Sequence, residues 1–153
     1  MKCLQLFLLL TASNLVIASS SLFDLEVGKI NVFDVQSICR MTFLGFNNVD
    51  VLSVYRMDAI QFDEKCIYQG AAEGITLNFD ESDILVLVEV DIDGDVSKHI
   101  QNEFDKKYEF VTLPLSERLL YGEKAALYKD GPIFLAVIFD EDVNRTVVSV
   151  FVE

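Results

Sequence analysis

The chain is poor in the residues that carry most catalytic and metal chemistry. Its 153 residues include one His, three Cys and no Trp. A histidine-based relay has to use His99, and no Ser lies in a G-x-S-x-G turn. No glycine-rich loop precedes a predicted helix to hold phosphates, and the Cys and His content does not complete a usual zinc shell without carboxylates. We therefore expect no cofactor and no catalytic residues.

Basic residues are scarce as well. Twelve Lys and Arg stand against 25 Asp and Glu, which gives a net charge of −13. Nucleic-acid binding is disfavoured because Lys and Arg hold the phosphate backbone, and an anionic membrane surface is disfavoured for the same reason. Asp, Glu or Lys interrupts every apolar run after residue 21, so none reaches the roughly 20 residues that cross a bilayer. The sequence predicts no nucleic-acid partner and no membrane span.

The first twenty residues have the layout of a secretory signal peptide. Met1 and Lys2 form a short basic start, an apolar core follows over residues 4–10, and small residues place cleavage near 18 to 20. We predict a signal peptide over residues 1–20 and a single secreted, extracellular β-rich domain over residues 21–153. Loss of Lys2 with the leader makes the net charge more negative, at −14.

The two cysteines beyond the leader are Cys39 and Cys66, since Cys3 belongs to the signal peptide. Thiols that can reach each other normally bond in an oxidising compartment. We predict a Cys39–Cys66 disulfide, which would restrict the unfolded chain by about 3 to 4 kcal/mol. Two buried free thiols are the alternative.

One glycosylation motif follows from the secretory route. Asn144, Arg145 and Thr146 read N-x-T, directly after the acidic run at 140–142 and between two apolar segments. This position predicts an exposed turn in which Asn144 accepts a glycan.

Alternation of apolar and polar residues with period two dominates the rest of the chain and predicts short strands. Strands are predicted at 30–35, 39–43, 49–55, 75–79, 84–90, 133–139 and 147–152, with a turn at 45–48 and short pairing segments at 59–62 and 65–69. Asp95 can cap a helix that carries Val96, Ile100 and Phe104 on one face, and a second helix can run from Ser116 to Gly122. The predicted fold is mainly β, an antiparallel sheet or sandwich-like domain with one or two short helices; an α+β fold is the alternative.

Three predicted strands, at 84–90, 133–139 and 147–152, are nearly continuous in apolar residues. A strand that is apolar on both faces must be covered on both faces, whereas a two-sheet sandwich covers only one. The additional cover could be helices, a partner subunit or a bound apolar ligand. Helices on the sheet are the default arrangement.

The carboxylates Asp91, Asp93 and Asp95 alternate as the first ligands of an EF-hand calcium loop do. The sixth position, where that loop needs Gly, is Val96, and the twelfth, where it needs Glu, is Asn102. Asp91, Asp93 and Asp95 are therefore an incomplete candidate calcium site. The alternative is an acidic turn that keeps the end of an apolar strand soluble and discourages edge pairing.

Together these features predict a secreted, non-enzymatic acidic protein that acts through protein–protein contacts. Its acidic potential would steer it toward a basic partner, and self-association is the other option. Two alternatives remain open from the sequence. One is an extracellular carrier of a small apolar ligand, and the other is a carboxylate-dependent hydrolase.

Overall fold

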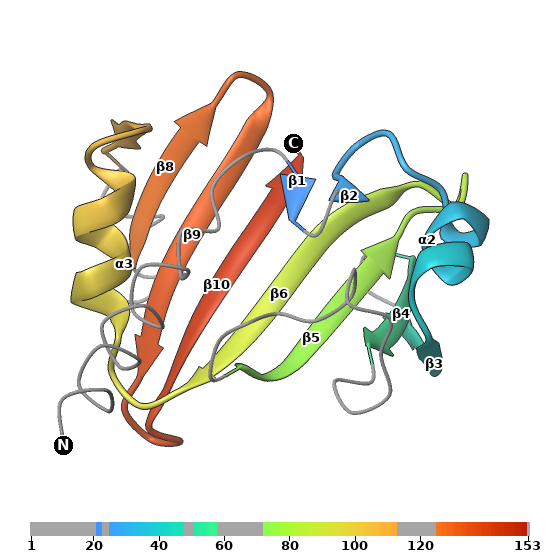
Figure 1. Ribbon diagram of the computed structural model, residues 1–153, viewed down its shortest axis with the longest axis horizontal. Helices are drawn as coiled ribbons and strands as arrows, with labels where there is room; N and C mark the ends of the chain where they lie inside the picture. The colour runs from blue at the N-terminus through green and yellow to red at the C-terminus, as the bar shows by residue number, and fades with distance from the viewer. Residues whose placement is uncertain (1–20, 23–24, 48–50, 58–71, 113–124, 153) are drawn as a thin grey trace, which may run out of the picture.

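The computed structural model describes residues 21–22, 25–47, 51–57, 72–112 and 125–152. Eight of the described strands form one antiparallel sheet in the order β3-β4-β5-β6-β10-β9-β8-β7 (Figure 1). The strands are β3 Met41–Asn47, β4 Leu52–Met57, β5 Ala72–Phe79, β6 Leu85–Asp93, β7 Glu109–Val111, β8 Ala126–Asp130, β9 Ile133–Asp140 and β10 Arg145–Val152. Two further short strands, β1 (Ser21–Leu22) and β2 (Leu25–Glu26), pair with each other.

Two short helices complete the described structure, α2 (Val32–Ile38) and α3 (Ser97–Phe104). The prediction of a mainly β fold with antiparallel strands and one or two short helices is therefore confirmed. Eight of the described strands form one large sheet, and β1 and β2 form a separate two-stranded one. The predicted helix at 116–122 and the predicted strands at 59–62 and 65–69 lie outside the described residues.

The predicted strand at 30–35 is wrong, because this segment forms α2. The Asn31 side chain accepts hydrogen bonds from the backbone N–H groups of Phe33 (2.9 Å) and Asp34 (3.0 Å), which caps the helix N-terminus. Val32 and Val35, three positions apart, lie on the buried side of this helix. The capping residue therefore outweighs the β preference of the two valines.

Helix α3 confirms the helix that the spacing of Ile100 and Phe104 predicted. Ile100 and Phe104, four positions apart, are both buried. The Asp95 carboxylate accepts hydrogen bonds from the Ser97 N–H (3.1 Å) and hydroxyl (2.6 Å), although Val96 is the residue at the helix boundary. The predicted cap is therefore wrong by one residue: Val96 occupies the N-cap position, and Asp95 binds Ser97 from the residue before it.

The two halves of the described fold have the same order of elements. A helix followed by four strands occurs first as α2-β3-β4-β5-β6 and again as α3-β7-β8-β9-β10. The last strands of the halves, β6 and β10, are antiparallel neighbours at the centre of the sheet, with Val90 opposite Val148. The first strands, β3 and β7, form its two edges. This arrangement gives the sheet an approximate two-fold axis between β6 and β10.

Both helices contribute to one hydrophobic core on one face of the sheet. Val35 of α2 and Phe104 of α3 belong to the same cluster as Val90 and Val148 from the central strands. The ring of Phe104 packs edge-on against Tyr128 of β8, with centroids 5.4 Å apart. Figure 1 shows α2 and α3 near opposite ends of the sheet. Helical cover, the expected default, is therefore present on this face, which we call the core face; the opposite face is called the open face.

Candidate interaction surface

Strand β3 forms one edge of the sheet and carries large exposed apolar side chains. Its side chains Phe43, Leu44 and Phe46 are 47%, 56% and 66% exposed, and Val51 in the following turn is 55% exposed. We call these four side chains the β3 patch. Strand β3 pairs with β4 on one side, and no described strand pairs with it on the other. An exposed apolar edge of this kind is a typical site for contact with another protein chain.

The aromatic rings of the β3 patch are supported from the core. Phe46 and Phe43 lie 5.2 Å apart between ring centroids, and Phe43 lies 5.2 Å from Tyr55 on β4. Tyr55 in turn packs edge-on against Phe79 at 5.4 Å, and Phe79 is fully buried. Because each ring rests on the next, the exposed rings are held in place before any partner arrives, which lowers the entropy lost on binding.

The hairpin that carries the patch lacks acidic residues in both strands. From Met41 to Asn47 the sequence has no charged residue, and β4 contains only Arg56. Arg40 directly precedes β3. A β-bulge between Phe43 and Gly45 interrupts the register with β4. The two strands therefore carry one basic and no acidic side chain in a strongly acidic protein, while the sequence between them includes Asp50.

The open face of the central strands is also apolar, but its side chains are half-buried and lie among carboxylates. Leu87, Phe151 and Phe134 form one row across β6, β10 and β9. The two phenyl rings stack at 5.6 Å and 18°. Next to this row lies Glu89, whose pKa is raised by burial and, to a smaller extent, by the nearby charge of Asp91. The open face thus has an apolar row across the central strands and acidic side chains beside that row.

Two of the three candidate calcium residues, Asp91 and Asp93, lie beside Arg145. Arg145 Nη1 lies 3.7 Å from Asp91 Oδ2, and Arg145 is the strand partner of both Asp93 and Asp140. Asp95 is used at the start of α3 instead. Within the described ranges, no group of three or more His, Cys, Asp or Glu side chains is placed to hold a metal ion.

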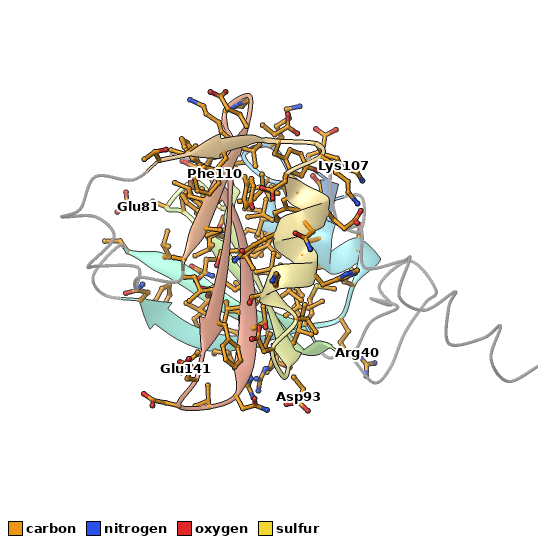
Figure 2. The ribbon with its side chains drawn as sticks, turned by 90° about the vertical axis from the view of Figure 1, so that its left-hand side faces the viewer. Arg40, Glu81, Asp93, Lys107, Phe110 and Glu141 are labelled. Carbon is orange, nitrogen blue, oxygen red and sulfur yellow. The ribbon has the colours of Figure 1, made fainter. Side chains whose placement is uncertain are left out.

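Carboxylates in three acidic segments form local turns. Asp80 Oδ1 accepts the Ser82 N–H (2.8 Å), and Asp140 Oδ1 accepts the Asp142 N–H (3.0 Å), each two residues downstream. Asp95 makes the same contact with Ser97. Figure 2 places Asp93 and Glu141 at the same end of the sheet. The carboxylates of Asp80, Asp95 and Asp140 therefore hold local turns, a structural role that requires no ligand.

The glycosylation motif spans a turn and a buried position. Asn144 is exposed in the turn between β9 and β10, has a positive φ of 51°, and accepts the Gly94 N–H through its carbonyl (2.9 Å). Thr146 is fully buried; its hydroxyl donates to the Gly94 carbonyl (2.8 Å) and accepts from the Val96 N–H (3.0 Å). A glycan on Asn144 would point to solvent, and its attachment stays a prediction.

Three further features of the sequence analysis are the cysteine pair, the signal peptide and His99. Cys39 is 3% exposed and follows α2, while Cys66 lies outside the described residues, so the disulfide stays a prediction. The predicted signal peptide also lies outside them. His99 is exposed on α3.

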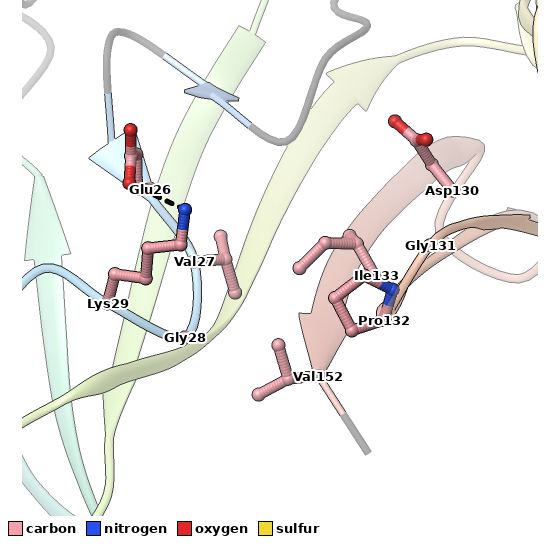
Figure 3. Close-up of a pocket in the computed structure, with 9 residues that line it drawn as sticks. All are labelled: Glu26, Val27, Gly28, Lys29, Asp130, Gly131, Pro132, Ile133 and Val152. Atoms are coloured by element: carbon pink, nitrogen blue, oxygen red, sulfur yellow. Dashed lines mark ion pairs between the residues drawn. The ribbon is translucent and has the colours of Figure 1, made fainter.

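A cavity of about 400 Å³ lies at one end of the sheet, between the turn that follows β2 and the β8–β9 turn (Figure 3). Its apolar wall comes from Val27, Pro132, Ile133 and Val152. Charged side chains also line it: Asp130, and Glu26 with Lys29, which form an ion pair at 3.1 Å. The volume lies at the lower end of the range that small-molecule sites occupy, about 300–1,000 Å³.

Sequence reasoning missed the β3 patch. The available signal was the uncharged stretch 41–49, in which apolar residues occur at both odd and even positions. A strand with one solvated face does not need that pattern.

Comparison with protein-family models, curated proteins and solved structures finds no match to this chain. Among the described helices, none has the length and hydrophobicity to span a membrane.

Proposed function

We propose that this chain is a secreted, non-enzymatic interaction protein that binds a protein partner through the β3 patch. The observation that supports it is the exposure of Phe43, Leu44 and Phe46 on a strand whose outer edge faces no described strand. Water contact at three large apolar side chains is unfavourable, and burial against a partner removes it. The two strands of the hairpin carry no acidic side chain, so a partner that contacts them meets less of the negative charge that dominates the protein.

Secretion is part of the same proposal. The basic start, apolar core and small residues of positions 1–20 support a signal peptide. The proposal includes a single extracellular domain over residues 21–153, the Cys39–Cys66 disulfide and a glycan on Asn144. N-terminal sequencing, peptide mapping without reduction and glycosidase treatment of protein from culture medium test these features one by one.

The binding test uses the chain expressed in its source and recovered under native conditions. Native mass spectrometry should find it in a complex with protein, and the double variant Phe43→Ser/Phe46→Ser should lose that complex. Phe33→Ser is the matched control, because Phe33 is 69% exposed but lies on α2 rather than on β3. A complex that survives the double variant, or a chain that is recovered without any bound protein, would contradict the proposal.

The cavity favours a second candidate function, that of a carrier for a small apolar ligand. Four apolar side chains line a volume of about 400 Å³. The same native spectra test this candidate, since a carrier from its source should retain a small molecule at one copy per chain. Loss of that mass after extraction with organic solvent, with return on adding the extract, would support it; a bare polypeptide mass before extraction would rule it out.

A further inference from the structure

We infer that the open face binds a small organic cation, an amine carried on an apolar body, with Glu89 as its counter-ion. Glu89 lies on the central strand β6, and its strand partners are Ser149 of β10 on one side and Thr76 of β5 on the other. The apolar row that contains Leu87 and Phe151 lies two residues along these strands, a distance of about 6.6 Å. This site is separate from the β3 patch and does not depend on the proposed function.

Glu89 is a half-buried carboxylate without a counter-ion. It makes no ion pair and no side-chain hydrogen bond with the residues that the structure describes. Burial, and to a smaller extent the charge of Asp91, raises its pKa, so its ionised form is unfavourable in the unliganded protein. A bound cation would relieve this, because an opposite charge nearby favours the ionised carboxylate.

The basic side chains of the described strands on the open face are engaged elsewhere. Arg145 Nη1 lies 3.7 Å from Asp91 Oδ2. Lys129 Nζ lies over a phenyl ring of β9, 5.2 Å from its centroid. The Arg56 guanidinium lies against Gly74, since a Cβ added to that glycine would be 3.2 Å from Arg56 Nη2. A protein with a net charge of −13 attracts the missing cation from solution.

Asn78 is a second unsatisfied group on the same face. It is 5% exposed, and its buried Nδ2 has no hydrogen-bond partner in the described structure. Buried donors are almost always paired, so an unpaired one needs an explanation. Asn78 is the strand partner of Leu87 and is therefore diagonal to Glu89, at about 7–8 Å. An acceptor on the ligand would pair with the Asn78 amide after a turn about its terminal torsion, which is soft.

The surroundings of Glu89 favour an organic cation over a metal ion. No group of three or more His, Cys, Asp or Glu side chains in the described ranges is placed to hold a metal, and calcium takes six to eight oxygen ligands. Leu87 and the Phe151 ring, which stacks on Phe134 at 5.6 Å, offer apolar contact to the body of an amine. The ligand therefore combines an ammonium group, an apolar body and a hydrogen-bond acceptor.

Isothermal titration calorimetry of the purified chain with tyramine tests the inference. Tyramine carries an ammonium group, an aromatic body and a hydroxyl, and its two polar ends are about as far apart as Glu89 and Asn78 are. It should bind at one molecule per chain. The amine-free analogue 4-ethylphenol should bind at least tenfold more weakly, and 2-phenylethylamine, which lacks the hydroxyl, should bind a few times more weakly.

Two substitutions of equal charge locate the cation. Glu89→Gln should weaken tyramine binding at least tenfold. Glu109→Gln is the matched control and should change binding by less than twofold, because Glu109 lies on the same face but four strands away, at about 19 Å.

The role of Asn78 has its own readout. Asn78→Leu should reduce tyramine binding to the level of 2-phenylethylamine, and if this variant fails to fold, the two amines compared on the wild type give the same information. In amide NMR spectra, residues 76–78, 87–89 and 149–151 should shift on titration with tyramine, while residues 109–111 should not.

Three results would overturn the inference: no saturable binding of tyramine at millimolar concentrations, equal binding of tyramine and 4-ethylphenol, or equal losses in Glu89→Gln and Glu109→Gln. The last result would indicate a general attraction of cations to an acidic protein. Tighter binding of Nα-acetyl-lysine amide than of tyramine would also overturn it, by assigning the site to a lysine side chain of a protein. The proposed function would stand in each case, because it depends on Phe43 and Phe46.

Discussion

Tyr128 joins three elements at the α3 end of the sheet. Its hydroxyl donates to Asp105 Oδ1 at 2.9 Å, just beyond the end of α3. Its ring packs against Phe104 of α3 (5.4 Å) and Phe110 of β7 (5.6 Å). Burial first, and then the hydrogen bond to Asp105, raises the pKa of this phenol above its ordinary value. One side chain thus secures both the helix and the edge strand.

We expect Tyr128→Phe to lower the free energy of unfolding by about 1–2 kcal/mol, because it removes a hydrogen bond to a charged acceptor and leaves the packing intact. Urea unfolding monitored by circular dichroism measures this change. Tyr108→Phe is the control: its ring packs on Phe104 at 5.3 Å, but its hydroxyl makes no hydrogen bond with the described residues, so its effect should stay below about 0.5 kcal/mol. Equal losses in both variants would show that the Asp105 bond contributes nothing.

Glu89 makes the stability of the sheet depend on pH. Burial, with a smaller effect from Asp91, raises its pKa above the ordinary value of 4.5, so the folded state binds this proton more tightly than the unfolded state does. The stabilisation of the folded state that comes from this tighter proton binding is fully present below pH 4.5. It is lost as the pH rises through the pKa of Glu89 in the folded state.

Glu89→Gln should therefore be more stable than the wild type at pH 7, and the difference should shrink toward pH 4. Thermal unfolding at a series of pH values measures this trend. The same substitution at Glu109, which is exposed on β7, should produce no comparable gain. A Glu89→Gln variant that is less stable than the wild type at pH 7 would show that the carboxylate is favourable where it lies.

At the scale of the element, the turn after β2 is attached to the start of β6 and lies close to the end of β10. The Gly28 N–H donates to the Leu85 carbonyl at 2.7 Å. Gly28 has a φ of +84°, and a Cβ added there would lie 2.9 Å from Val152 Cγ1. Both the backbone conformation and the close approach require glycine.

Gly28→Ala should cost about 1–3 kcal/mol, more than Gly131→Ala. Gly131 also has a positive φ (+59°), but a Cβ there would meet no atom within 4 Å. The excess cost of Gly28→Ala therefore measures the contact with Val152, and adding Val152→Ala should remove that excess. Chemical denaturation of Gly28→Ala, Gly131→Ala, Val152→Ala and the Gly28→Ala/Val152→Ala double variant provides the comparison. Equal costs for the two glycine variants would mean that Val152 moves aside freely.

The sequence predicted those elements whose local pattern and tertiary environment agree. The apolar segments at 84–90, 133–139 and 147–152 became β6, β9 and β10, and the spacing of Ile100 and Phe104 indicated α3. Strands β7 and β8 were not predicted, because three and five residues are too short for alternation to stand out. The segment at 30–35 failed because a single Asn cap decided between two patterns that its valines allow.

The candidate surface was harder to predict than the fold. The sequence of a strand does not show whether another strand lies on each side of it. The exposure of Phe43 and Phe46 could therefore not be predicted from the sequence of β3 alone. The acidic residues at 91–95 suggested a cation, and the structure places Arg145 beside Asp91. That pairing depends on the antiparallel register of β6 and β10, between residues more than fifty positions apart.

For the whole molecule, the excess of 25 acidic over 12 basic residues works against compactness. Repulsion among like charges is relieved when the chain expands, and salt weakens that repulsion. Raising NaCl from about 10 to about 500 mM should therefore raise the melting temperature.

Differential scanning calorimetry measures this response, and two exposed positions test its origin. Glu81→Lys lowers the acidic excess and should reduce the dependence on salt, whereas Lys98→Glu raises the excess and should increase it. Identical salt responses in both variants would point to a general salt effect rather than to net charge.

The central position of β6 and β10 has a consequence for biosynthesis. Residues 85–93 are made well before residues 145–152, yet each strand needs the other to fill the middle of the sheet. While the ribosome is still adding the intervening residues, the earlier half has an apolar strand with one bare side. A nascent chain that stalls before Arg145 would present this side to other chains. Premature termination should therefore yield aggregation-prone fragments that chaperones retain, rather than a smaller folded product.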